Sequence, residues 1–110
     1  MSDRRVVLCT VARAEDADRI ADQLVERRLA ACVNVLPGVR SVYRWRGRVE
    51  RDEEHLLVIK TTAHRFEALR DEIVRLHPYD VPEIVALTIE AGHRPYLDWL
   101  DASCSDGEPA

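Results

Sequence analysis

The spacing of hydrophobic residues changes several times along the chain, and each change marks a predicted element. Residues 6–12 form an apolar run rich in β-branched side chains, which predicts a strand covered on both faces. From 14 to 29 the apolar positions recur every three or four residues, so we expect an amphipathic helix. Acidic residues occupy its first turn and arginines its last, an order that complements the helix dipole. The chain therefore begins with a strand and a helix.

Two further strands are predicted to form an unusually long hairpin. The first covers 31–36 and is expected to continue through a bend at Pro37-Gly38 into a strictly alternating segment. That alternation separates an aromatic face from an arginine-rich face, for which we expect solvation and cross-strand ion pairs. A turn within 48–53 should lead into a return strand over 56–61. Because such an arm extends past a small core, its aromatic face needs a cover, and a second subunit would supply it.

The remainder of the chain predicts a helix, a strand and a short last helix. Apolar spacing places the helix over 63–76, and Pro78 prevents its continuation. A strand follows within 83–91, a third helix begins at Pro95, and residues 103–110 form a polar, frayed tail. The order β-α-β-β-α-β predicts an α+β, ferredoxin-like split βαβ sandwich with a long hairpin arm. Two helices on one sheet face leave the other face open, which again favours an oligomer.

Composition narrows the class of protein. The 110 residues suit one domain, with an ordered core over about 5–102. Hydrophobic residues at 46% and charged residues at 33% are typical of neither a disordered nor a membrane-embedded chain. A formal charge of −4 argues against nucleic-acid or anionic-membrane partners. We expect neither a transmembrane helix nor a signal peptide.

Three cysteines are too few, and odd in number, for a disulfide framework. The expected location is therefore the reducing cytoplasm. Cysteines within Val-rich strands usually serve as small core residues, so we predict that Cys32 is buried and inert. Cys104, in the predicted tail, should be exposed.

A metal site could be assembled only from residues distant in sequence. Cys9 lies in the first strand and His77 just before the fourth, and a split βαβ fold places these strands close together. A thiolate with an imidazole suits copper or zinc, and two such ligands bind weakly unless another group, such as Glu83, completes the shell. The alternative is that His77 only orients the end of the preceding helix. Glu83 opens a strand, where a carboxylate is disfavoured unless it is paired or functional.

Several motifs resemble the divalent-cation tolerance protein CutA family. They lie in matching order and span about residues 5–102. They are Leu29–Asn34, Ser41–Gly47, Glu54, Lys60-Thr61, His77-Pro78-Tyr79, Pro82-Glu83-Ile84 and Tyr96–Leu100. The resemblance implies a homotrimer similar to the PII signalling proteins, a role in tolerance to copper and other divalent cations, and no catalytic activity.

The same resemblance implies copper ligands at Cys9 and at a histidine pair of which only His77 is present. The position before it is Leu76, which belongs to the apolar stripe of the predicted helix. We therefore expect only a weak copper site, formed by Cys9 and His77 with Glu83 as a third ligand. Subunit interfaces are expected at Tyr43, Trp45 and Trp99.

A different function is open to the same fold. An acylphosphatase-like hydrolase would use Arg13 after the first strand to hold phosphate and Asn34 on the second to position water. Against it, the segment between the first strand and helix contains no glycine, whereas a phosphate loop is expected to be Gly-rich.

Overall fold

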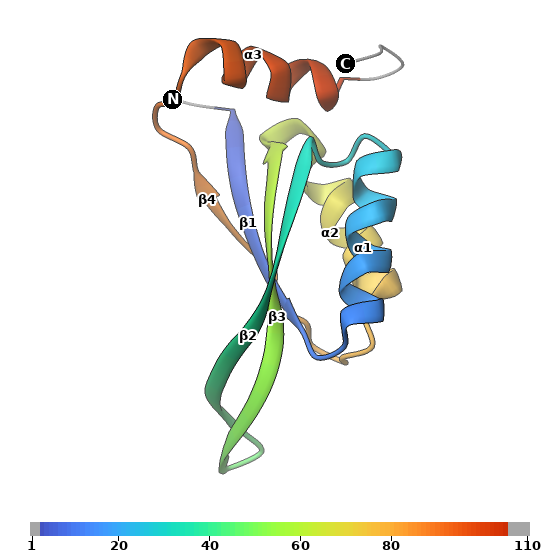
Figure 1. Ribbon diagram of the computed structural model, residues 1–110, viewed down its shortest axis with the longest axis vertical. Helices are drawn as coiled ribbons and strands as arrows, with labels where there is room; N and C mark the ends of the chain where they lie inside the picture. Colours follow the sequence, from blue (N-terminus) through green and yellow to red (C-terminus); the bar gives the residue numbers. More distant parts are fainter. Residues whose placement is uncertain (1–2, 106–110) are drawn as a thin grey trace.

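The computed structural model describes residues 3–105 and contains a four-stranded antiparallel sheet with helices on one face (Figure 1). The strand order β2-β3-β1-β4 is that of a ferredoxin-like split βαβ fold, as predicted. Helix α3 lies across the end of the sheet where β1 begins. The elements are β1 Arg4–Val11, α1 Ala14–Glu26, β2 Cys32–Trp45, β3 Arg48–Thr62, the 3-10 turn η1 Ala63–Arg65, α2 Phe66–Leu76, β4 Val85–Thr88 and α3 Arg94–Ser103. None of the helices in this described part is long and apolar enough to cross a membrane.

The main core lies between the sheet and helices α1 and α2. Alternate residues of β1 point toward the helices, as the period of two in a strand requires. Val7, Cys9 and Val11 are fully buried there and pack with residues of β3 and both helices. These partners are Leu57, Ile59, Ala17, Ile20, Leu24, Leu69 and Ile73. The helix-facing side of the sheet is thus covered within one chain.

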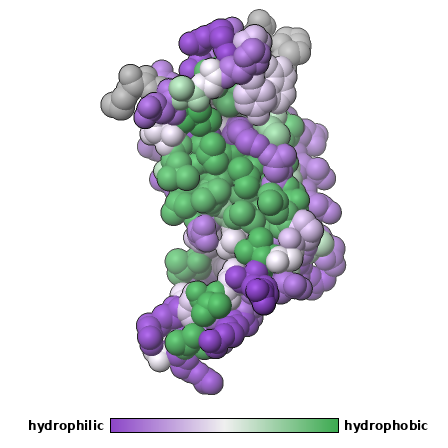
Figure 2. All heavy atoms as spheres, turned by 60° about the vertical axis from the view of Figure 1, so that its left-hand side comes forward, coloured by the Kyte–Doolittle hydropathy of each residue, from purple (hydrophilic) through white to green (hydrophobic). Residues whose placement is uncertain are grey.

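The opposite face of the sheet is apolar and exposed. Residues paired directly across antiparallel strands point to the same face. Leu8 is paired with Val85 and Val6 with Leu87, so these β4 side chains point away from the helices. Val85 and Leu87 are 48% and 54% exposed, and Figure 2 shows a broad hydrophobic surface over this part of the molecule. No element within residues 3–105 covers it, as the helix positions predicted.

Strands β2 and β3 pair with each other to form the long arm. Strand β2 continues through Pro37-Gly38 and does not end there. A register shift between Leu36 and Val39 marks the expected bend. The predicted turn over 48–53 is wrong, because Trp45 pairs with Arg48 and the turn is Arg46-Gly47. Both turn residues have positive φ, 51° and 79°, which is the backbone of a type I′ hairpin turn. The predicted cross-strand ion pairs of the arm are not formed within residues 3–105.

Several element boundaries differ from the prediction, and three of these differences have a local cause. Helix α1 ends before Arg28, whose φ of 59° is left-handed and breaks the helical path. The segment predicted as one helix begins instead with η1. Strand β4 is shorter than the predicted 83–91, because its pairing with β1 covers only Val85–Thr88.

Two cysteine predictions are wrong. Helix α3 extends to Ser103, so Cys104 lies in a small second core with Ala31 and Leu100 and is 2% exposed. Ser103 is buried as well, so the predicted frayed tail does not begin there, and 106–110 lie outside the described residues. Cys32, at the start of β2, is only partly buried.

Thiol labelling tests this corrected assignment. Burial raises the pKa of Cys9 to about 12 and raises that of Cys104, so both remain protonated near neutral pH. Because the thiolate is the reactive form, Cys32 should react before the other two in the native protein. Cys32→Ser should abolish the fastest phase, measured by release of a chromogenic thiol reagent. Equal labelling rates at Cys32 and Cys104 would contradict the assignment.

Candidate functional site

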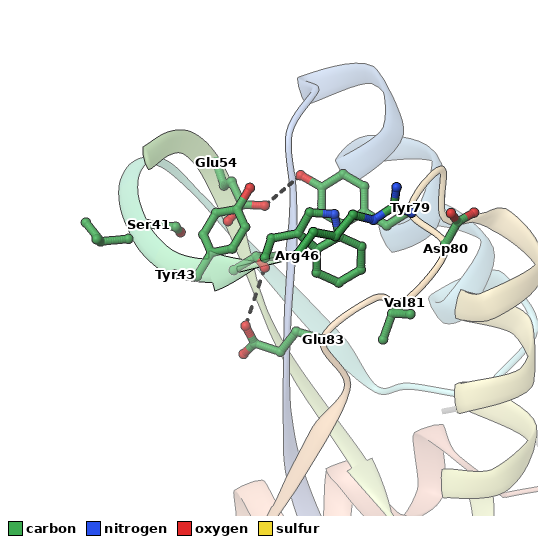
Figure 3. Close-up of a pocket in the computed structure, with 11 residues that line it drawn as sticks. Ser41, Tyr43, Arg46, Glu54, Tyr79, Asp80, Val81 and Glu83 are labelled. Carbon is green, nitrogen blue, oxygen red and sulfur yellow. Dashed lines mark hydrogen bonds between the residues drawn. The ribbon is translucent and has the colours of Figure 1, made fainter. Parts of the chain in front are cut away.

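A pocket lies between the arm and the connection that joins α2 to β4. Its volume is about 680 Å³, and it is lined by residues of β1, both arm strands and the connection (Figure 3). The lining includes Thr10, Tyr43, Trp45, Glu54, Tyr79 and Glu83. Segments distant in sequence thus meet at one place, as the strand order brings β1 beside both β3 and β4.

His77 anchors the connection to β1 through one ring nitrogen and bonds within the connection through the other. The Tyr79 backbone N–H can only donate, and it lies 3.1 Å from Nδ1. Nε2 therefore carries the proton and donates to the Thr10 backbone carbonyl at 2.8 Å. The His77 and Tyr79 rings also contact each other, with centroids 4.6 Å apart. This arrangement fixes the tautomer of His77 and agrees with the expectation that it orients the end of the helix.

Tyr79 and Glu54 join the connection to the arm. The Tyr79 hydroxyl donates to Glu54 Oε2 at 2.6 Å, and Figure 3 shows the two side chains pointing toward each other. Burial, and then the bond to Glu54, hold the pKa of Tyr79 far above its ordinary value, so the phenol stays neutral. Nearby, Thr10 Oγ1 donates a long bond of 3.4 Å to Glu83 Oε1. On the arm, Tyr43 donates to Asp52, which raises the pKa of Tyr43 to about 12.

Cys9 and His77 converge, as their strand positions predicted. The Cys9 thiol lies 3.9 Å from the Thr10 carbonyl oxygen that also accepts from His77 Nε2. Glu83 lines the pocket with the Thr10 side chain, and alternation points that side chain to the face opposite Cys9. Cys9 and His77 thus meet at the Thr10 carbonyl, whereas Glu83 contacts the Thr10 side chain on the opposite face of the strand.

These residues do not fit a copper site as they are placed. Both nitrogens of His77 are engaged, and the buried Cys9 thiol, with a pKa of about 12, is protonated. Over residues 3–105, no three His, Cys, Asp or Glu side chains are grouped closely enough to hold a metal ion. Leu76, which occupies the place of a second histidine, packs against the core.

The two residues of the hydrolase alternative lie in different parts of the fold. Arg13 precedes α1 and forms an exposed ion pair with Glu15 at 2.9 Å. Asn34 lies on β2 and accepts a hydrogen bond from Lys60 of β3. Each side chain is thus engaged with its own neighbour, and the structure does not support the hydrolase site.

The three predicted interface residues are all accessible in the single chain. Tyr43, Trp45 and Trp99 are each about two-fifths exposed. The Trp99 ring contacts Tyr96 on α3, and the Arg46 guanidinium lies over the Trp45 ring, 5.5 Å from its centroid. Large aromatic side chains at this level of exposure are typical of interaction surfaces.

Sequence reasoning overlooked the pairing of Glu54 with Tyr79. The signal was Glu54 itself, which lies two residues before the apolar segment of β3 that contributes Leu57 and Ile59 to the core. A carboxylate at such a position needs a partner. The partner is 25 residues away, and no local spacing identifies it.

Replacing His77 with alanine should destabilise the subunit by about 2–4 kcal/mol. The change removes a buried ring and leaves the Thr10 carbonyl and the Tyr79 N–H without their partner. Urea unfolding, followed by far-UV circular dichroism, measures the loss. His64→Ala is the control, because His64 is exposed and should change the free energy of unfolding by less than about 0.5 kcal/mol. Equal effects of the two substitutions would argue against an anchoring role.

The chain matches a family model described as CutA1 divalent ion tolerance protein over residues 5–103. The divalent-cation tolerance protein CutA of Thermus thermophilus is 59% identical over 95 residues, which cover 86% of this chain and 92% of that protein. A chloroplastic CutA of Oryza sativa is 46% identical over 98 residues, or 89% of this chain. The match spans only 55% of that longer protein.

Solved structures show the same fold. A Thermus thermophilus structure superposes with a TM-score of 0.91 at 55% identity, covering 93% of this chain and 99% of that one. A periplasmic CutA from Archaeoglobus fulgidus gives a TM-score of 0.90 at 37% identity, covering 93% and 99% of the two chains. The resemblance extends over nearly the whole chain in both sequence and structure.

Proposed function

Because this chain belongs to the CutA1 divalent ion tolerance protein family, we propose that it acts as a homotrimer in the response to copper and other divalent cations, without catalysing a reaction. A role similar to that of the PII signalling proteins fits this proposal. In such a signalling protein, ligand binding changes the state of the assembly, and the ligand itself is not changed chemically.

The observation that carries the proposal is the uncovered apolar sheet face, continued by the aromatic residues of the arm. Val85 and Leu87 are about half exposed on that face, and Tyr43 and Trp45 are about two-fifths exposed on the arm. A single chain of this size gains no favourable free energy from an apolar surface that stays in water, whereas a second copy that covers the surface supplies it. Head-to-tail contact between copies buries it repeatedly and closes into a ring when the rotation fits, which suits a trimer.

Direct copper binding by Cys9, His77 and Glu83 remains a prediction. To bind copper, His77 must give up a hydrogen bond and the Cys9 thiol must lose its proton. The cost of both changes supports weak binding. Because the Cys9 thiol must be deprotonated to bind copper, the affinity for copper should increase with pH.

The cytoplasmic location also remains a prediction. Two similar proteins are named chloroplastic and periplasmic, so membership of the family does not decide the compartment.

Native mass spectrometry with and without copper tests assembly and metal binding together. We expect the mass of three subunits, and copper adducts only at high copper concentration. Cys9→Ser should remove those adducts, whereas Cys32→Ser, the matched control outside the proposed site, should keep them. A stable monomer at micromolar concentration would contradict the trimer. Unchanged adducts in Cys9→Ser would contradict the copper site while leaving the trimer intact.

A further inference from the structure

The two faces of the arm carry opposite charges. Tyr43 is paired directly with Glu50, so the aromatic face of the arm also carries the alternate acidic residues of β3. These residues are Glu50, Asp52 and Glu54, and Arg48 is the one basic residue that the pairing places beside them. The opposite face carries Arg40, Arg44 and Arg51, with Glu53 as its one acidic residue. One face of the arm is therefore acidic and the other is basic.

Neither set of charges is compensated within the described chain. Over residues 3–105, the three arginines of the basic face are exposed and form no ion pair, and no Lys, Arg or His side chain pairs with the three carboxylates. Glu54 is only 6% exposed, and its Oε2 accepts a hydrogen bond from the neutral Tyr79 hydroxyl. A carboxylate removed from water needs compensation, and a neutral hydroxyl supplies only part of it. The acidic face therefore favours cations from outside the chain.

The basic face of the same arm cannot supply these cations. Arg44 and Glu50 are close in sequence, but they point to opposite sides of a two-stranded ribbon. Figure 1 shows the end of the arm projecting past the helices and the rest of the sheet, where no other described element reaches it. The two faces can therefore compensate each other only when the arms of two copies meet.

The type of symmetry decides which faces meet. A two-fold contact brings the same surface of each copy together, so it would place one acidic face against another. A head-to-tail contact brings different surfaces together, and in a closed ring each copy uses both. Resting on the trimer of the proposed function, we propose that neighbouring arms pair by charge. The acidic face of one subunit, with Glu50, Asp52 and Glu54, receives Arg40, Arg44 and Arg51 of the next.

Reversing the charge of each face tests the proposal. Arg44→Glu with Arg51→Glu makes the basic face acidic, and Glu50→Arg with Asp52→Arg makes the acidic face basic. Either double variant places like charges against each other between subunits, so each should weaken assembly about tenfold or more. The variant with all four substitutions exchanges the two faces and should recover most of the lost affinity. Sedimentation velocity over a dilution series measures the subunit concentration at which each protein dissociates.

Asp18→Arg with Asp22→Arg is the matched control. Both aspartates are exposed on α1, in the helical layer, and their reversal should leave the assembly unchanged. Circular dichroism establishes that each variant is folded before the affinities are compared. Wild-type assembly of both arm variants, no recovery in the folded fourfold variant, or equal weakening by the α1 control would overturn the charge pairing while leaving the trimer intact. A wild type that stays monomeric would instead contradict the proposed trimer itself.

Discussion

Trp45→Ala should weaken the association of the subunits by about 2–4 kcal/mol, the range of an interface hot spot. Trp45 lies at the end of β2, next to the turn of the arm, and is 42% exposed in the single chain. In the proposed trimer the remaining exposed ring is buried against a neighbouring copy. Removing it loses that burial and leaves a hollow in the contact. Sedimentation velocity over a dilution series should show smaller species at concentrations where the wild type remains assembled.

Val74→Ala is the control for the loss of an exposed hydrophobic side chain. Val74 is about half exposed on α2, in the helical layer opposite the uncovered sheet face. The Val74→Ala substitution should leave the assembly unchanged. If Trp45→Ala assembles as tightly as the wild type, the arm is not at the interface. If Val74→Ala dissociates equally, the contact involves the helical layer.

The second large effect is expected at alkaline pH. Burial raises the pKa of Cys9 from 9.0 to about 12, and the negative charges of Glu83 and Glu54 add to the shift. The unfolded chain releases the thiol proton near pH 9, whereas the folded chain retains it until about pH 12. The stability contributed by the neutral thiol is therefore complete below pH 9 and is lost as the pH rises toward 12. This residue alone should lower the free energy of unfolding by up to about 1.4 kcal/mol per pH unit in that window.

Comparison with Cys9→Ala isolates the contribution of the thiol. The variant loses some packing at every pH, but its stability should fall less steeply from pH 9 to 11 than that of the wild type. Denaturant midpoints at several pH values give the two slopes. Cys32→Ala should keep the wild-type slope, because Cys32 lies outside the core cluster that contains Cys9. Parallel slopes for wild type and Cys9→Ala would show that Cys9 is not the buried group responsible.

The fold could be predicted because its elements follow from local periodicity. The β-branched run of β1 and the helical spacing of α1 and α2 are properties of neighbouring residues, and their order limits the topology to few choices. The turn of the arm was misplaced because an acidic segment, Glu50–Glu54, resembles a loop, whereas the positive φ of Arg46 and Gly47 decides the position. Cys104 was misplaced because only tertiary packing against Ala31 and Leu100 buries it.

The site could be predicted only in part. Cys9 and His77 meet because the topology brings their strands together, which the element order already implied. The state of His77 depends on two backbone groups, the Thr10 carbonyl and the Tyr79 N–H. Backbone groups are the same in every residue, so no side-chain pattern reveals which of them a ring will meet. The pocket depends on side chains of segments distant in sequence, and no local spacing brings these together.

The position of β1 in the sheet sets the order in which the protein can fold. Strands β2 and β3 are joined by a two-residue turn, so the arm closes through local contacts and can form early. Strand β1 lies between β3 and β4, and its partners are His55–Thr62 of β3 and Val85–Thr88 of β4. On the ribosome, the first strand therefore stays unpaired until β3 has been synthesised, and its second edge stays unpaired until β4 follows. Docking of β1 should limit the folding rate, and the nascent chain should depend most on chaperones during that interval.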